Sequence, residues 1–322
     1  NIAEHRLPQD GRMKLKMGDK EIDVRVSILP TVHGEKAVLR LLGSGGKELN
    51  LSNLGFPDKK LTTFKKWIAQ PYGMIIISGP TGSGKSTTLY AALQEIKSES
   101  INITTVEDPV EYQIPGINQI QVHDSIGLSF AAALRSILRQ DPDVLLIGEI
   151  RDQETADIAV KFSMTGHLVF STVHANDAPS TISRLLDLGI PPFLLGSSLN
   201  LIMAQRLVRT IDSDEKEKDN PTSDQIQRLG LSKKEAGSIK FFKGKPTQQN
   251  HNTGYKGRTA IHEILEVNSS IREMIFDKRS ESEIKAQAVK NGMTPLREAG
   301  IDKIKSGEST VEEILRATVE DI

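Results

Sequence analysis

Residues 79–86 read GPTGSGKS and fit the phosphate-loop pattern G-x-x-x-x-G-K-[ST]. Glycines at this spacing let backbone N–H groups converge on phosphate oxygens, and a helix that follows adds the positive end of its dipole. Lys85 is expected to meet the β- and γ-phosphates, and the Ser86 hydroxyl to hold Mg²⁺. An apolar strand, MIIIS, precedes the loop and a helical pattern, STTLYAALQEI, follows it, so the context fits nucleotide binding. The predicted nucleotide-binding residues of this loop are Gly79, Pro80, Thr81, Gly82, Ser83, Gly84, Lys85, Ser86 and Thr87.

A second candidate group is Glu149, which ends the apolar run of LLIGEIRD at residues 145–152. A carboxylate at the end of a buried strand can serve Mg²⁺, directly or through water, and can orient or deprotonate an attacking water. A structural ion pair with Arg151 is the alternative, but pairing alone does not explain why the acid follows this strand. We therefore expect Glu149 to be catalytic and to lie on a strand next to that of the phosphate loop.

Two further predicted strands end in polar groups. NITTVEDPVE ends in Glu107 and Asp108, with Glu111 close by, and HLVFSTVHAND ends in His174. If these strands are parallel, their carboxyl ends share one edge of the sheet, and such edges bind ligands. We expect Glu107 and Asp108 to act at the nucleotide. We also expect His174 to hydrogen-bond a phosphate or report its presence, although a lone histidine is more often structural.

The elements that must position these groups alternate along the chain. Strands are expected at 74–78, 102–106, 143–148 and 167–173, and helices at 84–96, 128–140 and 154–164. This alternation predicts an α/β fold with a largely parallel sheet. Residues 12–42 read as short strands, 43–55 as a glycine-rich linker, the segment after Arg209 as a charged loop or insertion, and 258–322 mainly as helices.

Composition limits the function classes. The chain has 322 residues, 37% of them hydrophobic, which allows two or three domains with a sizeable core. Lys and Arg (41) nearly balance Asp and Glu (42), and no basic–aromatic stripe is present, so no nucleic-acid partner is expected. The sequence contains no cysteine, which excludes disulfides and cysteine-ligated zinc. No apolar run is long enough to predict a membrane span.

Taken together, the motifs resemble the secretion ATPase superfamily, in its type II secretion and type IV pilus-assembly branch (GspE/PilB-like). GPTGSGKSTTLY resembles the Walker A box of that family, ITTVEDPVE its Asp box, LRQDPDVLLIGEIRD its Walker B box and GHLVFSTVHANDA its His box. LPQDGR and RVSILPTVHGEKAVLRLL resemble its N2 domain, and MAQRLVRT, NTGYKGRTAIHEIL and GMTPLREAG resemble later segments. The likeness spans nearly the whole chain.

The resemblance implies a RecA-like P-loop core that is preceded by a small α+β, PAS-like N2 segment and followed by a C-terminal helical subdomain. The implied parts are N2 at 1–45, a linker at 46–56, the core at 57–209, an insertion at 210–257 and the helical subdomain at 258–322. The insertion corresponds to the four-cysteine zinc module of many members, but without cysteine it is expected to bind no zinc.

The resemblance also implies site residues and partners. Arg25 and Arg40 of N2 would reach the phosphates when the domains close, and a guanidinium from another domain would couple hydrolysis to movement. Further arginines carried over by position are Arg135, Arg139 and Arg258, with Arg209 as a weaker candidate. The implied protein is a homohexameric ATP-hydrolysing motor in the cytoplasm, peripheral to the bacterial inner membrane. Its implied partners are an inner-membrane platform protein and a cytoplasmic-domain adaptor.

Two other function classes remain open from the sequence. A nucleotide-dependent switch would bind ATP without rapid turnover, and a RecA-like translocase would move nucleic acid. Glu149 and the Asp box favour hydrolysis over the first, and the balanced charge argues against the second. A GTPase is not expected, because no N-K-x-D base-reading motif is present.

Overall fold

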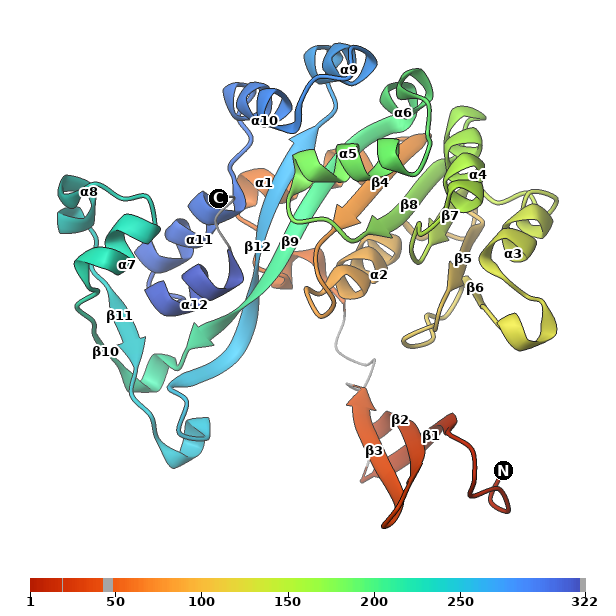
Figure 1. Cartoon of the computed structure of the whole chain (residues 1–322), viewed down its shortest axis with the longest axis horizontal. Coiled ribbons are helices and arrows are strands. Elements are labelled where there is room, and N and C mark those ends of the chain that lie inside the picture. Colours follow the sequence, from red (N-terminus) through yellow and green to blue (C-terminus); the bar gives the residue numbers. More distant parts are fainter. Residues whose placement is uncertain (19, 43–48, 319–322) are drawn as a thin grey trace.

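The computed structural model describes residues 1–18, 20–42 and 49–318. In this part of the chain a seven-stranded sheet has the order β12-β9-β4-β8-β7-β5-β6. Figure 1 shows this sheet at the centre of the molecule, with helices on both faces and the N-terminal strands projecting away from it. The strands of the sheet are β4 (Gly73–Ser78), β5 (Ile103–Glu107), β6 (Asn118–Gln121), β7 (Val144–Ile147), β8 (Leu168–Val173), β9 (Leu199–Ile211) and β12 (Tyr255–Glu266).

The sheet is parallel from β9 through β6, and β12 joins its edge antiparallel to β9. The predicted α/β alternation and the largely parallel sheet are therefore present. One expectation was wrong: the strand before Glu149, β7, does not neighbour the phosphate-loop strand β4, because β8 lies between them. Strand order depends on how the crossover helices pack, and a strand pattern in the sequence does not encode it.

Alternate residues of the central strands enter two separate cores. Ile75 and Ile77 of β4 face the helices α1 (Asp58–Ile68) and α2 (Lys85–Ile96). Met74 and Ile76 face the opposite side. The helices of that side and of the C-terminal part are α3 (Phe130–Ile137), α4 (Gln153–Met164), α5 (Ala178–Asp187), α6 (Pro192–Ser198), α9 (Ser269–Phe276), α10 (Glu281–Lys290), α11 (Leu296–Lys305) and α12 (Val311–Ala317). Burial on both faces explains why these strands read as continuous apolar runs.

The C-terminal part is more than a helical subdomain. Residues 258–266, which were expected to be helical, belong to β12 and complete the sheet. The reason is that 260–265 are buried on both sides, which removes the alternation that marks a half-exposed strand. Helices were correctly expected from there on, and α11 and α12 pack on β12 and β9 respectively.

The insertion between β9 and β12 forms an extension at one end of the molecule (Figure 1). It contains the antiparallel pair β10 (Lys216–Lys218) and β11 (Phe242–Gly244), with α7 (Ser223–Arg228) and α8 (Lys233–Ser238) between them. The sequence predicted a loop or insertion here, and the short capped helices give it more regular structure than that.

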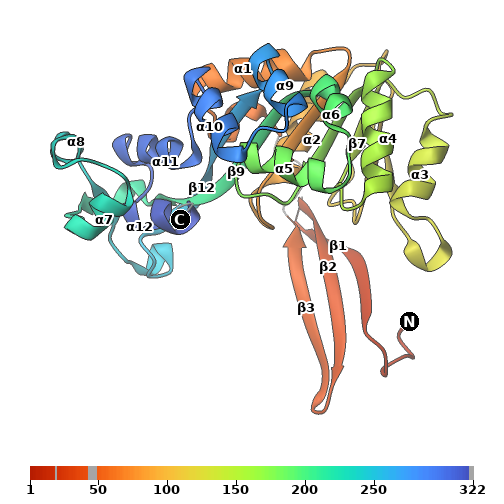
Figure 2. The ribbon, with the colours of Figure 1, turned by 45° about the horizontal axis from the view of Figure 1, so that its top comes forward.

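At the N-terminus, β1 (Gln9–Met17), β2 (Lys20–Thr31) and β3 (Gly34–Leu42) form an antiparallel sheet, as the strand patterns predicted. Figure 2 shows it projecting from the body below the edge of the central sheet. A side-chain contact joins the two, since Arg12 Nη2 donates to the Val110 carbonyl in the loop after β5.

The predicted linker at 46–56 partly packs against the body of the protein. Its residues 46–48 lie outside the described residues. Leu51 is fully buried, and the Phe56 ring stacks on the His262 imidazole of β12 with ring centroids 3.7 Å apart. Lys60 at the start of α1 donates its ammonium to the His262 carbonyl. Burial lowers the pKa of His262 to about 3, so this imidazole is neutral, and neither of its buried ring nitrogens has a hydrogen-bond partner within residues 1–18, 20–42 and 49–318. No helix in the described part of the chain combines the length and the apolar character that crossing a membrane requires.

A buried carboxylate, Glu263 of β12, joins two helices to the sheet. Its Oε1 accepts from the Ala178 N–H at the start of α5 at 2.7 Å, and its Oε2 accepts from the Leu296 N–H at the start of α11 at 3.0 Å. Helix N-termini favour a negative charge, but removal from water outweighs this and raises the pKa of Glu263 to about 7.

We expect this carboxyl to make folding depend on pH. Since its native pKa of about 7 exceeds the ordinary value of 4.5, the native state binds more protons in that window, and stability falls as pH rises through it. Glu263→Gln cannot titrate, so the free energy of unfolding of the wild type minus that of the variant should decline by about 3 kcal/mol across the window. Denaturant unfolding at several pH values measures it.

The matched control is Glu273→Gln, which changes an exposed carboxylate on α9. The difference in free energy of unfolding between the wild type and this variant should stay constant over the same pH range. A flat difference for Glu263→Gln as well would contradict the raised pKa.

Candidate nucleotide site

The phosphate loop turns sharply between β4 and α2, and close packing against β9 requires its glycines. Gly79 has φ +148° and Gly84 has φ +87°. A Cβ at Gly79 would lie 2.5 Å from the Gln205 carbonyl oxygen, and one at Gly84 would lie 2.9 Å from Gln205 Nε2. Only glycine fits both positions without strain. The loop therefore presents its N–H groups together with the N-terminus of the twelve-residue helix α2.

Lys85 is the first residue of α2 and lies over the loop. Its Nζ donates to the carbonyl oxygens of Gly79, at 2.7 Å, and Pro80, at 3.2 Å. Partial burial lowers the pKa of Lys85, and the nearby Glu149 carboxylate opposes that shift. An ammonium held at this place can move to a phosphate oxygen by a change of side-chain rotamer.

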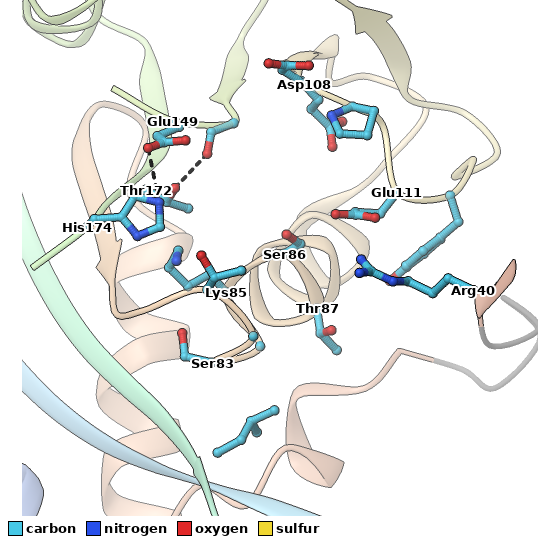
Figure 3. A pocket seen from close by; sticks show the side chains of 18 of the residues that line it. Arg40, Ser83, Lys85, Ser86, Thr87, Asp108, Glu111, Glu149, Thr172 and His174 are labelled. Atoms are coloured by element: carbon cyan, nitrogen blue, oxygen red, sulfur yellow. Dashed lines mark hydrogen bonds and ion pairs between the residues drawn. The ribbon is translucent and has the colours of Figure 1, made fainter. Parts of the chain in front are cut away.

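Glu149 is mostly buried, with 18% of its side chain exposed, at the carboxyl end of β7. Its Oε2 accepts from Arg151 Nε at 2.7 Å. Its Oε1 lies 3.2 Å from Nε2 of His174, which follows β8, and Figure 3 shows this second contact. Arg151 Nη1 is in turn 3.6 Å from an Asp108 oxygen. The ion pair with Arg151 and the place at the cleft occur together, so the two interpretations of this acid do not exclude each other.

The two acids after β5 differ in their surroundings. Glu107 is buried, and its carboxylate accepts from Thr105 at 2.5 Å, from Gln119 at 3.3 Å and from the Tyr90 hydroxyl. Burial raises the pKa of Glu107 despite these donors. Asp108 is exposed and meets Arg151. The contacts of Glu107, with Thr105, Gln119 and Tyr90, are those of a residue that stabilises the structure around the end of β5. Asp108 is the acid of the two that is open to solvent.

These groups line one cleft of about 760 Å³ at the carboxyl ends of the strands. Figure 3 shows Lys85, Ser86 and Thr87 on one wall and Asp108 and Glu149 on another. Of the residues predicted from the sequence, the lining includes Thr81, Gly82, Ser83, Gly84, Lys85, Ser86, Thr87, Glu107, Asp108, Glu149, His174, Arg40 and Arg258. Gly79 and Pro80 line a smaller hollow beside it, together with Thr81 and His174.

Arg40 enters this cleft from β3, and its guanidinium points toward the side where Thr87 and Glu111 lie (Figure 3). Arg258 enters from β12. The cleft thus takes cationic groups from three separate elements, which suits the charge of a triphosphate.

The other predicted arginines do not line the cleft. Arg25 lies on β2 directly opposite Arg40. Arg135 forms an exposed ion pair with Glu154, and Arg139 donates to the Arg135 carbonyl at 2.9 Å. Arg209, the weaker candidate, pairs with the buried Glu313 at 2.9 Å and stacks over Tyr255.

The residues around the phosphate loop fit Mg²⁺ and a nucleotide. Ser86 lines the cleft together with Glu149, and these two would hold the ion, which would neutralise phosphate charge. Among the described residues no group of three or more His, Cys, Asp or Glu is placed to hold a metal. Magnesium at a phosphate loop needs no such group, because substrate phosphates supply most of its ligands.

Sequence reasoning missed Gln205 as a support of this site. Its Oε1 accepts from the Thr88 hydroxyl at 2.9 Å, and its Nε2 donates to the Ser83 carbonyl at 2.8 Å. The side chain is buried on β9, so it ties the loop and α2 to the sheet. The Gln205 amide in the middle of the largely apolar run LNLIMAQRLV was the available signal, since a buried amide must be hydrogen-bonded.

Comparison with known proteins agrees with this geometry. The model of the family described as "Type II/IV secretion system protein" matches residues 1–316. The chain is 48% identical over its whole length to the type IV pilus assembly ATPase PilB of Myxococcus xanthus, of which it covers 57%. It is also 48% identical over 99% of its length to the type II secretion system protein E of Xanthomonas campestris pv. campestris, of which it covers 56%. The chain thus spans little more than half the length of these relatives.

A solved structure titled as the pilus retraction motor PilT with bound ADP resembles the chain at TM-score 0.72 and 28% identity, covering 98% of this chain and 79% of that one. The Legionella pneumophila ATPase DotB resembles it at TM-score 0.68 and 21% identity, covering 96% and 76%. The predicted α/β class with a RecA-like P-loop core is confirmed.

We expect Gln205→Leu to weaken nucleotide binding, because it leaves the Ser83 carbonyl and the Thr88 hydroxyl without their partner. Loss of two buried hydrogen bonds, one to the phosphate loop and one to α2, should raise the Kd for ATP by about tenfold or more. Titration with a fluorescent ATP analogue measures this. Gln205→Glu keeps the acceptor for Thr88 but places a second oxygen against the Ser83 carbonyl in a buried site, so it should weaken binding at least as much as Gln205→Leu. Wild-type affinity in Gln205→Leu would contradict a supporting role.

Proposed function

Because the chain belongs to the type II/IV secretion system protein family, we propose that it is the motor part of an ATPase that powers type II protein secretion or type IV pilus assembly. The observation that supports this proposal is that Lys85, Glu149 and Arg40, which come from separate elements, line the same cleft. The names of the relatives at 48% identity include both systems, so the branch stays open.

The proposed reaction is attack of water on the γ-phosphorus of ATP, which breaks the bond between that phosphorus and the β–γ bridging oxygen and releases ADP and inorganic phosphate. The loop N–H groups and Lys85 bind the phosphates, and the transferred group gathers charge that cations must offset. Mg²⁺, held by Ser86 and Glu149, supplies part of that neutralisation when bound. Arg40 and Arg258 add guanidinium groups from outside the core strands of the sheet.

Glu149 is the proposed group that orients or deprotonates the water. Its carboxylate is held from two sides, by Arg151 and His174, which fixes its direction. His174 comes from β8, the strand between β4 and β7, and so lies between the phosphate loop and the acid. This place supports the proposal that it responds to the γ-phosphate.

Coupling to work is the role we assign to the N-terminal sheet. Arg40 brings that sheet to the cleft, so occupancy of the cleft and the position of the sheet depend on one another. A homohexamer, an inner-membrane platform protein and a cytoplasmic adaptor complete the proposed setting, which places the motor in the cytoplasm at the bacterial inner membrane. Arg25, Arg135 and Arg139 stay candidates for phosphate contacts, and no zinc site is proposed.

We expect Lys85→Ala to abolish ATP hydrolysis and Glu149→Gln to lower kcat by about 100-fold or more, the usual effect of removing a general base. Glu149→Gln should keep ATP affinity, because binding rests on the loop. Steady-state phosphate release measures kcat, and equilibrium ATP binding measures the affinity. The matched control is Glu95→Gln, which changes a surface carboxylate of α2 that pairs with Lys65 and should leave both unchanged.

Two outcomes would redirect the proposal. Unchanged turnover in Glu149→Gln would favour the nucleotide switch over a motor. Stimulation of wild-type turnover by DNA, with a steep dependence on salt, would favour a nucleic-acid translocase.

A further inference from the structure

Three arginines form one row across the N-terminal sheet. Arg12 of β1 is the register partner of Arg25 of β2, and Arg25 is the register partner of Arg40 of β3. Side chains at directly opposed positions lie on the same face, with Cβ atoms about 5 Å apart. The row therefore places three guanidinium groups side by side.

Such a row is unfavourable on its own. Like charges directly opposite each other destabilise a sheet, and arginine does not lose its charge in proteins. Of the two rows that flank it on the same face, one consists of Asp10, Ser27 and Val38 and the other of Lys14, Asp23 and Leu42, so two carboxylates accompany three arginines and a lysine. A multivalent anion close to the row would remove the repulsion, and the cleft beside Arg40 is the place where a triphosphate is proposed to bind.

Both ends of the row meet the body at the same cleft. Arg40 lines it directly, and Arg12 Nη2 donates to the Val110 carbonyl. Val110 is buried, and its chain neighbours Pro109 and Glu111 both line the cleft. Arg12 therefore joins the N-terminal sheet to the loop after β5, and this loop forms one wall of the cleft.

We propose that Arg12 is a positioning residue for hydrolysis, which holds the sheet on this loop so that Arg40 faces the phosphates. This inference rests on the proposed ATPase function and extends it to a residue that the sequence did not single out. Arg12 acts through Arg40 and does not touch the reacting atoms. Its loss frees the sheet from the loop and withdraws Arg40 from the cleft.

The test is a double-mutant cycle on the full chain with ATP and Mg²⁺. Arg12→Ala should lower kcat by about tenfold, the usual scale for a lost hydrogen bond from a charged donor, with the Kd for ATP within about twofold of wild type. Because Arg12 works through Arg40, Arg12→Ala with Arg40→Ala should be no slower than Arg40→Ala alone. Arg12→Lys, which keeps one charged donor, should recover part of the rate.

Lys14→Ala is the matched control, because it removes a cation from the same strand and the same face without touching the loop. It should keep the wild-type rate. The inference is overturned if Arg12→Ala is kinetically silent, if its effect multiplies with that of Arg40→Ala, or if Lys14→Ala slows the enzyme equally. Failure of the proposed function would look different, because wild-type protein would then show no hydrolysis that depends on Lys85.

Discussion

The parallel register of β4, β8, β7 and β5 is the constraint on which the candidate site depends. All these strands run in one direction, so the phosphate loop, His174, Glu149 and Asp108 emerge at one edge. The buried strands exist because apolar residues face helices on both sides of the sheet. Disruption of one crossover helix would therefore displace groups that are distant from it along the chain.

The acids of the site differ in their electrostatic surroundings. Glu107 is buried among neutral donors and has a raised pKa, whereas Glu149 shares a network with Arg151, His174 and, through Arg151, Asp108. Arg40 and Arg258, from outside the parallel strands, line the same cleft as these acids. Such an arrangement matches a ligand with negative phosphates and a bound cation more closely than it matches a neutral ligand.

Much of the fold and of the site followed from the sequence, because strand periods, glycine spacing and strand-terminal acids are local signals. The phosphate loop, its flanking strand and helix, and the gathering of Glu149 and His174 at one edge came from such signals. The position of β8 between β4 and β7, the antiparallel β12 and the pairing of Arg12 with Arg25 did not. These depend on pairings between segments far apart in the chain, which no local pattern encodes. Gln205 was missed for a different reason, since one amide in an apolar strand carries a signal only when its partners are known.

The stack of Phe56 on His262 also determines how mechanical load would travel. The stretch of chain leading from the N-terminal sheet is held to β12 at Phe56, just before α1, and again at Lys60 in the first turn of α1. A pull exerted by that sheet would therefore reach the strand that carries Arg258, and the neutral aromatic contact at Phe56 would transmit it without an ionic bond that salt could weaken. Movement of the sheet would then be coupled to movement of Arg258, which lines the same cleft as Arg40.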